Sequence, residues 1–301
     1  MKKLFLFITC VFLIASCKEK DLMNPQTLEI KTIKDVKLVD GVLSFSSRQH
    51  LKDVIQEISA SKEMENWYSN PEFTSLLKRQ RSITQSEYDK IGKTGELGEL
   101  GDVLTFKGEG DNKILGKIIK IPELSAVLNS KSYVIVSDSA YHIGTNEVTS
   151  IHIGEDLDKL SSFLKDPYIQ GAHRVEIGRI TLKNARIQSD FRQTRGDRRI
   201  YGSNEIISFG GVGSYRQLYV EYLKKNWIGW SPTEAPRLSF TITATTQPYG
   251  GQYLYHKVEA WNVEGIGFTL QESTWGTLIY YNFNANMDCD VFGEYNFTAN
   301  F

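Results

Sequence analysis

The second half of the chain contains short runs in which apolar and polar residues alternate. The clearest run places Leu238, Phe240, Ile242 and Ala244 between Ser239, Thr241, Thr243 and Thr245. A period of two is that of a β-strand, because successive side chains point to opposite faces of a sheet. One apolar and one polar face is typical of an antiparallel sheet that is half exposed to solvent. This segment is therefore expected to be an antiparallel strand with one buried face.

Seven further runs of this kind follow residue 167, separated by turns that are often rich in glycine. They cover residues 175–182, 200–209, 215–223, 253–263, 267–271, 277–283 and 292–297. About eight short antiparallel strands are typical of two sheets packed face to face. We therefore expect residues 167–301 to form a β-sandwich-like domain.

The preceding part of the chain has a helical period instead. Leu51, Val54, Ile55 and Ile58 fall at the spacing of one helix face, and Ser47 is placed to cap that helix. Further helical patterns cover residues 71–81 and 155–164, a turn is expected at 86–91, and a strand pair at 133–144. Residues 40–166 are thus expected to be a small α+β domain. The change of period after Asp166 and Pro167 marks the expected boundary.

The N-terminus reads as an export signal. Two lysines precede an apolar run that ends at Ile14, which is too short to span a bilayer. The sequence Ile14, Ala15, Ser16, Cys17 resembles the lipobox of bacterial lipoproteins. This resemblance implies that residues 1–16 are a cleaved signal peptide and that Cys17 carries the lipid. The alternative is an ordinary cleaved signal with an incidental cysteine.

The residues after Cys17 suggest where such a lipoprotein would reside. Residues 17–39 are charged and then turn-prone, as expected of a tether between membrane and domain. Lys18, Glu19 and Asp21 partly resemble the charged signal that sends some Bacteroidetes lipoproteins to the cell surface. We therefore expect an outer-membrane lipoprotein, on the cell surface in preference to the periplasmic face.

Charge and cysteine content narrow the function classes. The 301 residues hold 35 Lys plus Arg and 36 Asp plus Glu, a net charge of -1. Removal of Lys2 and Lys3 with the signal leaves 33 minus 36, or -3. An acidic chain of this kind is not expected to bind nucleic acid. Without Cys10, and with Cys17 lipidated, Cys289 is the sole thiol, so no intramolecular disulfide can form.

Two stretches resemble a known group of proteins. The first combines Phe45, a helix ending near Trp67, Phe73 with Leu76, and the segment ELSAVLNSKSYVIVSDSAYHIG. The second is YVEYLKKNWIGWSPTEAPRLSFTIT, which includes Lys224, Lys225, Gly229 and Trp230. Together they resemble Bacteroidetes cell-envelope lipoproteins of unknown function. The resemblance implies an architecture and an envelope location, but no activity.

A basic stretch opens the second half. Residues 174–199 hold eight Lys or Arg and three acids, a net charge of +5. An arginine guanidinium can hydrogen-bond two oxygens of one oxyanion at once. We therefore consider Arg192, Arg195, Arg198 and Arg199 candidate binding residues for an anionic glycan, phosphate or lipopolysaccharide. The alternative is a solvated strand face ending in a hairpin tip.

Aromatic residues also gather in this half: Trp227, Trp230, Tyr253, Tyr255, Trp261 and Trp275. Tyr253, Tyr255 and Trp261 share one face of their expected strand, opposite Leu254, Val258 and Ala260. If the second face is buried, the first is an exposed aromatic row, which often marks a contact surface such as a sugar-binding platform. Alternatively, these rings pack between the two sheets.

No catalytic motif is present. The chain lacks a P-loop, a nucleophile elbow and a zinc-protease motif. His142 and His152 stand ten residues apart across an expected hairpin, which alone is weak evidence for zinc. We therefore expect that the protein binds no metal and no cofactor, and that it is not an enzyme.

These observations predict a lipid-anchored envelope or cell-surface binding protein. Its expected partners are the membrane, through Cys17, and a glycan or another envelope protein. Two alternatives stay open: a polysaccharide or cell-wall hydrolase, and a structural component of an envelope assembly.

Overall fold

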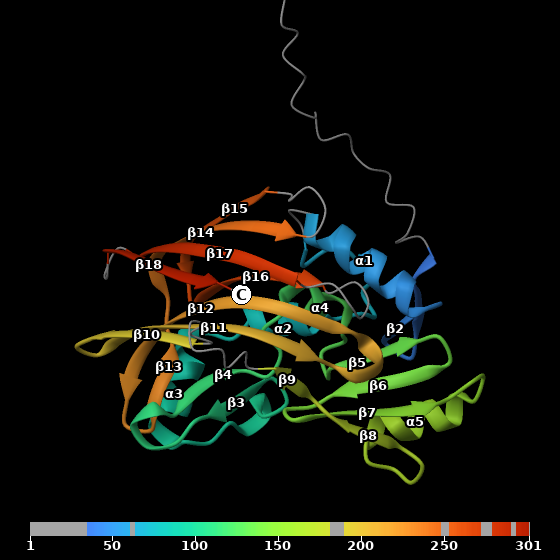
Figure 1. Ribbon diagram of the computed structural model, residues 1–301. Helices are drawn as coiled ribbons and strands as arrows, with labels where there is room; N and C mark the ends of the chain where they lie inside the picture. Colours follow the sequence, from blue (N-terminus) through green and yellow to red (C-terminus); the bar gives the residue numbers. More distant parts are fainter. Residues whose placement is uncertain are drawn as a thin grey trace, which may run out of the picture.

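The computed structural model describes residues 35–60, 64–180, 190–247, 253–271, 279–289 and 293–300 (Figure 1). The expected signal peptide, Cys17 and the tether up to residue 34 lie outside these residues. The described chain contains helices α1 (Arg48–Ala60), α2 (Leu76–Arg81), α3 (Gln85–Thr94), α4 (Pro122–Val127) and α5 (Leu157–Lys165). Its short 3-10 turns are η2 (Gly98–Leu100), η3 (Gly110–Asn112) and η4 (Gly210–Val212). Among the described helices, none combines the length and apolar character needed to span a membrane.

A six-stranded sheet forms the first part of the fold, in the order β1-β2-β5-β6-β7-β8. Its strands are β1 (Lys37–Val39), β2 (Val42–Phe45), β5 (Tyr133–Val136), β6 (Ser139–Ile143), β7 (Glu147–His152) and β8 (His173–Glu176). β2 and β5 run parallel, and the other neighbours run antiparallel. β8 follows the expected boundary at residue 166, yet it pairs with β7, which precedes that boundary.

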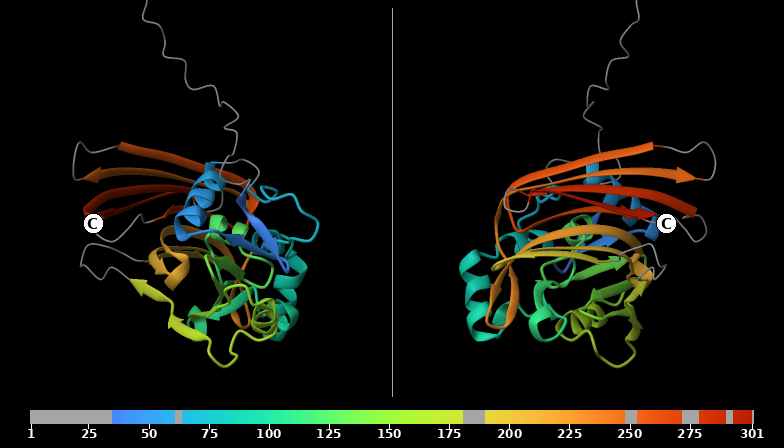
Figure 2. Two further views of the ribbon diagram at one scale, coloured as in Figure 1. Left: turned by 90° about the vertical axis from the view of Figure 1, so that its right-hand side faces the viewer. Right: turned by 60° about the vertical axis from the view of Figure 1, so that its left-hand side comes forward.

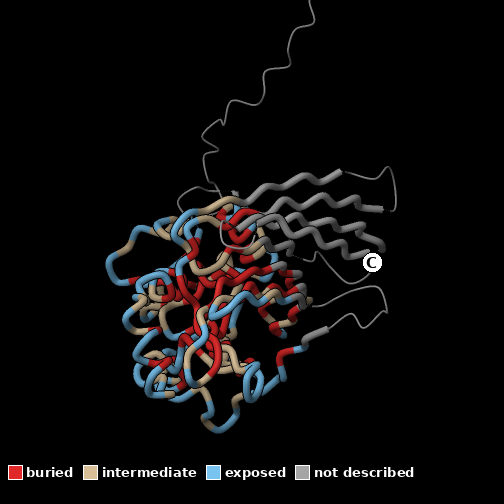
Figure 3. Tube along the Cα trace, turned by 90° about the vertical axis from the view of Figure 1, so that its left-hand side faces the viewer, coloured by how far each residue is buried: buried red, intermediate tan, exposed pale blue. Residues whose placement is uncertain are grey.

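At the centre of this sheet, strand β5 is buried on both faces. On one face Val134 and Val136 pack in the main core with the apolar side of α1. On the other face Tyr133 and Ile135 pack with α5 in a second, smaller core. Because β5 is covered on both sides, its sequence YVIV is apolar throughout rather than alternating. In Figure 3 the buried positions run through the interior of this part of the molecule.

A larger sheet joins strands from both halves of the chain. Its order is β10-β11-β12-β13-β4-β3, with β16 also paired to β12 and β9 to β11. The strands are β3 (Leu104–Lys107), β4 (Ile114–Lys117), β9 (Gly178–Ile180), β10 (Asp190–Arg195), β11 (Arg198–Ser208), β12 (Ser214–Asn226), β13 (Gly229–Pro232) and β16 (Gly265–Gln271). Two sheets therefore contain strands from both sides of residue 166. The division of the chain into two domains there stays a prediction.

Gly229 allows the two halves to meet. Trp230 pairs with Ile114 in the parallel bridge between β13 and β4, and its backbone N–H donates to the Lys113 carbonyl at 2.8 Å. Gly229 has a φ of +140°, and a Cβ added there would lie 2.2 Å from that same carbonyl oxygen. A side chain at this position would therefore separate the two strands.

The third sheet has four antiparallel strands in the order β15-β14-β17-β18. These are β14 (Ala235–Gln247), β15 (Tyr253–Val263), β17 (Ile279–Cys289) and β18 (Gly293–Asn300). In Figures 1 and 2 this sheet lies above β11 and β12, on the same side of the molecule as α1. The fold is thus mixed α+β, as expected. Most side chains of the third sheet lie outside those described, so sandwich packing stays a prediction.

Candidate functional site

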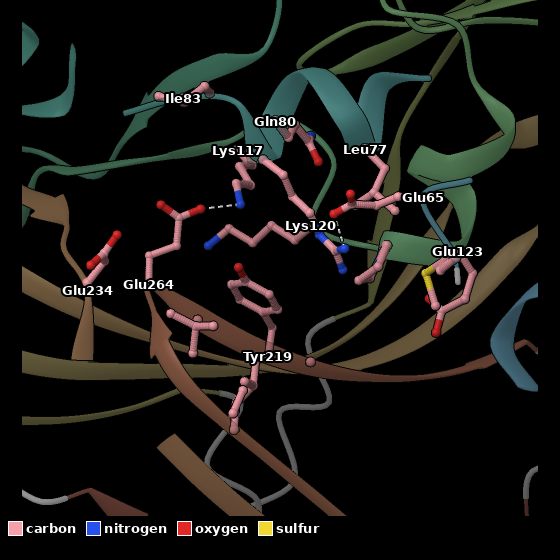
Figure 4. A pocket seen from close by; sticks show the side chains of 18 of the residues that line it. Glu65, Leu77, Gln80, Ile83, Lys117, Lys120, Glu123, Tyr219, Glu234 and Glu264 are labelled. Atoms are coloured by element: carbon pink, nitrogen blue, oxygen red, sulfur yellow. Dashed lines mark hydrogen bonds and ion pairs between the residues drawn. The ribbon is translucent and has the colours of Figure 1, made fainter. Parts of the chain in front are cut away.

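A cavity of about 750 Å³ opens where the two halves of the sequence meet (Figure 4). One wall comes from residues 64–83 and 117–123, which include α2 and the chain between β4 and α4. The other wall comes from β12, from Glu234 just before β14, and from the turn that joins β15 to β16. Its charged lining residues are Glu65, Arg81, Lys117, Lys120, Glu123, Glu234 and Glu264. We call this space the Lys–Glu cavity.

Lys120 and Glu221 form a buried ion pair beside the cavity. The Lys120 Nζ lies 2.6 Å from the Glu221 carboxylate, and their side chains are 9% and 3% exposed. Lys120 comes from an apolar segment whose neighbours Ile119 and Ile121 are buried. Two charges withdrawn from water are tolerated only when they are paired and further hydrogen-bonded. The pair therefore marks a position that the surrounding structure must hold accurately.

The backbone around Lys120 is fixed by two buried amide side chains. Gln80 of α2 donates to the Ile119 carbonyl at 2.9 Å. Gln217 of β12 donates to the carbonyl of Lys120 itself. The same lysine lies over the ring of Tyr219, with its Nζ 5.2 Å from the ring centroid. Lys120 is thus held from α2 on one side and from β12 on the other.

A second ion pair joins Lys117 at the end of β4 to Glu264 in the β15–β16 turn (Figure 4). The Glu264 carbonyl accepts from the backbone N–H of Tyr222 at 2.8 Å, which fixes the turn on β12. The turn begins after Asn262, whose φ of +53° is in the left-handed region, where Asn is among the better tolerated residues.

Tyr219 supplies a hydroxyl between these two ion pairs. Burial raises its pKa well above the ordinary value, and the negative charges of Glu221 and Glu264 raise it further. The hydroxyl therefore stays protonated and available as a donor. A Cβ added to Gly265 would lie 2.8 Å from this hydroxyl oxygen, so only glycine leaves room for the ring here.

A third ion pair, between Arg81 and Glu65, lies in the same cavity and is more exposed. With it, the lining carries three cationic and four anionic side chains. The remaining lining includes apolar side chains such as Leu77, Ile83 and Ile266. A cavity with nearly balanced charges, fixed donors and acceptors, and apolar patches can bind a polar ligand without demanding a net charge on it.

The cavity and the rest of the described chain contain no group of three His, Cys, Asp or Glu residues placed to hold a metal ion. In the β6–β7 hairpin His142 pairs with Thr149, and His152 pairs with Ser139. The two histidines are therefore not directly opposite each other across the strands. His152 instead lies 3.2 Å from the carboxylate of Asp138.

Several of the aromatic and basic residues predicted as ligands come together elsewhere, around η3. Trp230 is 3% exposed, and its Nε1–H donates to the Asp111 carbonyl at 2.9 Å. The Arg199 guanidinium covers its ring at 3.8 Å from the centroid. Arg192 donates to the Asn112 side chain at 2.6 Å. The ring of Trp230 is therefore part of the interior and offers little surface to a ligand.

The other predicted residues are spread over the molecule. Arg198 forms an ion pair with its neighbour Asp197 at 2.8 Å, and Arg195 is exposed. Trp261 is 60% exposed on β15, distant in sequence and sheet from the β12–β13 hairpin that carries Trp227. The side chains of Tyr253 and Tyr255 lie outside those described, as do Trp275 and Cys17. No single surface among the described residues unites the predicted set.

Sequence reasoning missed the Lys–Glu cavity. Lys120 and Glu221 are 101 positions apart, so no local pattern connects them. A weaker signal was present at each one, since Lys120 lies in the run IIKI and Glu221 in YVEYL. A charge at the centre of an apolar run is typical of a buried, paired group.

No protein-family model matches the sequence, and no curated protein matches it either. Among solved structures, the chain is similar to the crystal structure of a DUF4848 family protein from Bacteroides thetaiotaomicron, at 12% sequence identity. The match covers 89% of this chain and 100% of that chain, with a TM-score of 0.30. This is a similarity at low identity, and membership of a family of envelope lipoproteins stays a prediction. The lipoprotein features stay a prediction.

Proposed function

We propose that the protein is a lipid-anchored envelope protein that binds an uncharged saccharide in the Lys–Glu cavity. The observation that carries this proposal is the near balance of charge around one cavity, with three cations and four anions in its lining. A sugar hydroxyl both donates and accepts, so it satisfies ammonium and carboxylate groups alike. A strongly anionic or cationic ligand would meet repulsion from half of the lining.

The size and rigidity of the cavity support the same proposal. Its volume of about 750 Å³ is within the range usual for small-molecule sites, which is roughly 300–1,000 Å³. Lys117, Lys120 and Glu264 are each held by an ion pair or backbone contact before any ligand arrives. Polar groups fixed in advance lose little side-chain entropy on binding, which favours affinity.

The anchor and location belong to the proposal as well. A lipid on Cys17 would hold the protein at the outer membrane, and residues 18–34 would tether it there. The expected tether is thus shortened, because Val36 is part of the core and residues 37–39 form β1. Metabolic labelling with an alkyne-bearing fatty acid should mark the wild-type chain and not Cys17→Ser. Protease treatment of intact cells should degrade a cell-surface protein and spare one on the periplasmic face.

A glycan array followed by calorimetry on the full chain tests the binding proposal. Glu234→Gln and Lys117→Gln each remove one charged lining group, and we expect each to weaken binding of the best uncharged saccharide by about tenfold. Glu155→Gln is the matched control, because Glu155 is exposed and does not line the cavity. An array without any uncharged ligand, or equal losses in the control, would contradict the proposal.

The two alternatives have distinct outcomes in the same experiments. If new reducing ends are released from the bound saccharide, the protein is a hydrolase and the binding proposal is wrong. Loss of an envelope complex in a strain without the protein, together with an empty array, would favour the structural alternative.

A further inference from the structure

A second cavity lies between α3 and the β12–β13 hairpin. It has a volume of about 390 Å³ and shares no lining residue with the Lys–Glu cavity. One wall comes from the face of α3 that carries Gln85, Asp89 and Lys93, and the other from Lys224, Lys225 and Trp227 of the hairpin. A ligand here would therefore contact different residues from a ligand in the first cavity.

Trp227 is held in place although it is exposed. The residue is 71% exposed, while its Nε1–H donates to the Lys93 carbonyl at the end of α3. The neighbouring Asn226 accepts from the N–H of Ile228 at 3.1 Å and donates to the Ser231 hydroxyl at 2.5 Å. A Cβ on Gly92 would lie 2.7 Å from the Asn226 amide nitrogen, which shows how closely the hairpin approaches α3. The indole is thus fixed by one edge and leaves a large part of its surface open.

The charge around this tryptophan is positive. Three lysines and one aspartate line the cavity, a net charge of +2, although the whole chain has a net charge of -1. Asp89 already accepts from the Gln85 side chain at 3.1 Å. Lys225 reaches Asp111 only at 4.0 Å, and within the described residues no carboxylate pairs with Lys93 or Lys224. At least two ammonium groups are therefore available to an anion.

We propose that this cavity is a second binding site, specific for a saccharide that carries carboxylate groups. The apolar face of a pyranose ring stacks on the open surface of Trp227, and its carboxylate pairs with Lys93 and Lys224. Gln85 and Asp89 contribute hydrogen bonds to sugar hydroxyls. This inference goes beyond the proposed function, since it concerns another site and another class of saccharide.

The combination of groups selects this ligand class. The lysines alone would accept any small anion, but they do not explain a fixed and exposed indole. The indole alone would accept an uncharged sugar, but it does not explain the local excess of positive charge. A single-stranded nucleic acid also combines a stacking ring with negative charge, yet the acidic chain as a whole disfavours it.

The test is a calorimetric titration of the full chain with tri-galacturonate, at 50 and 300 mM salt. We expect binding that weakens as salt rises, because exposed ion pairs are screened. Trp227→Ala should weaken it by about tenfold or more, while Trp227→Phe, which keeps a ring, should lose less. The double variant Lys93→Gln/Lys224→Gln should lose affinity and most of the salt dependence.

Two controls distinguish this site from the rest of the molecule. Trp261→Ala removes the other tryptophan that is exposed among the described residues and should leave the titration unchanged. Glu234→Gln, in the Lys–Glu cavity, should also leave it unchanged. Wild-type affinity in Trp227→Ala would overturn the proposal, as would loss of uronate binding in Glu234→Gln alone. Tighter binding of a single-stranded oligonucleotide at Trp227 would overturn the ligand class. None of these results depends on whether the first cavity binds an uncharged sugar.

Discussion

The ammonium group of Lys120 lies 2.6 Å from the carboxylate of Glu221, and both side chains are nearly buried. The two residues come from segments 101 positions apart in the sequence. If one partner is removed in this buried environment, the other is left as a buried charge without a counter-charge. The pair therefore couples the stability of the fold to the geometry of the Lys–Glu cavity.

Replacing Lys120 by Met should destabilise the protein strongly. We expect the free energy of unfolding to fall by about 3–5 kcal/mol, because Glu221 remains buried without a counter-charge. Urea denaturation of the full chain measures this. The exposed pair of Arg198 and Asp197 gives the control, since Arg198→Gln should cost no more than about 1 kcal/mol. The double variant Lys120→Met/Glu221→Leu should be more stable than the single one, and a double variant that is less stable would contradict this reasoning.

His142 should make stability depend on pH. Burial lowers its pKa from 6.5 to about 4 in the folded protein. The unfolded chain therefore binds more protons between these values, so stability is complete above pH 6.5 and is lost as pH falls toward 4. The contribution of this group is at most about 3 kcal/mol. His142→Phe keeps a ring beside Tyr133, whose centroid is 4.6 Å away, and cannot titrate. Its unfolding free energy should fall less between pH 7 and pH 4.5 than that of the wild type.

Gly229 and Gly196 make a matched pair of glycines. Both have a positive φ, +140° and +61°, so an added side chain is strained at either position. Only at Gly229 would a Cβ also meet backbone, the Lys113 carbonyl oxygen at 2.2 Å. We expect Gly196→Ala to cost about 1–2 kcal/mol and Gly229→Ala clearly more, because β13 must move away from β4. Thermal unfolding followed by circular dichroism compares the two, and equal shifts would contradict the close approach described here.

Tyr215 and Tyr133 differ in whether their hydroxyl has a partner. Among the described residues the buried Tyr215 hydroxyl has no hydrogen-bond partner, whereas the Tyr133 hydroxyl donates to the Phe163 carbonyl at 3.2 Å. Tyr215→Phe should therefore leave stability unchanged or raise it by about 1 kcal/mol, while Tyr133→Phe should lower it by a similar amount. Chemical denaturation of both variants checks the difference in sign.

Local features of the fold could be predicted from local patterns. The apolar stripe of Leu51, Val54, Ile55 and Ile58 is buried in α1, and Ser47 accepts from the His50 N–H at 3.0 Å as a cap. Most of the expected strands of the second half appear, with changes at their ends. The run expected over 175–182 is instead divided between β8 and β9, which belong to two different sheets. The helix expected over residues 71–81 begins only at Leu76, because Ser75 caps it by accepting from the Lys78 N–H. Phe73 is buried without being helical, so apolar spacing alone misplaced this end.

Long-range features could not be predicted in this way. Nothing near Trp230 in the sequence shows that its strand pairs with β4, and burial of its ring follows from that pairing. The same is true of the Lys–Glu cavity, which needs five separate segments to meet. Trp227 was one of several aromatic residues predicted as ligands, but the lysine whose carbonyl accepts its Nε1–H lies on α3, 134 positions away. Patterns of hydrophobic period and of charge describe a single helix or strand. Binding sites form between several elements, so such patterns do not predict them.

The bridge between Trp230 and Ile114 also constrains the order in which the chain can fold. It joins positions 116 residues apart, 230 minus 114. Contacts of such long range slow folding, because the loop between them must be closed before the contact contributes any stability. Until β13 has been synthesised, β4 has only β3 beside it and presents an open edge that another chain could pair with. A chain in which β13 has not yet paired with β4 therefore exposes an edge that favours aggregation.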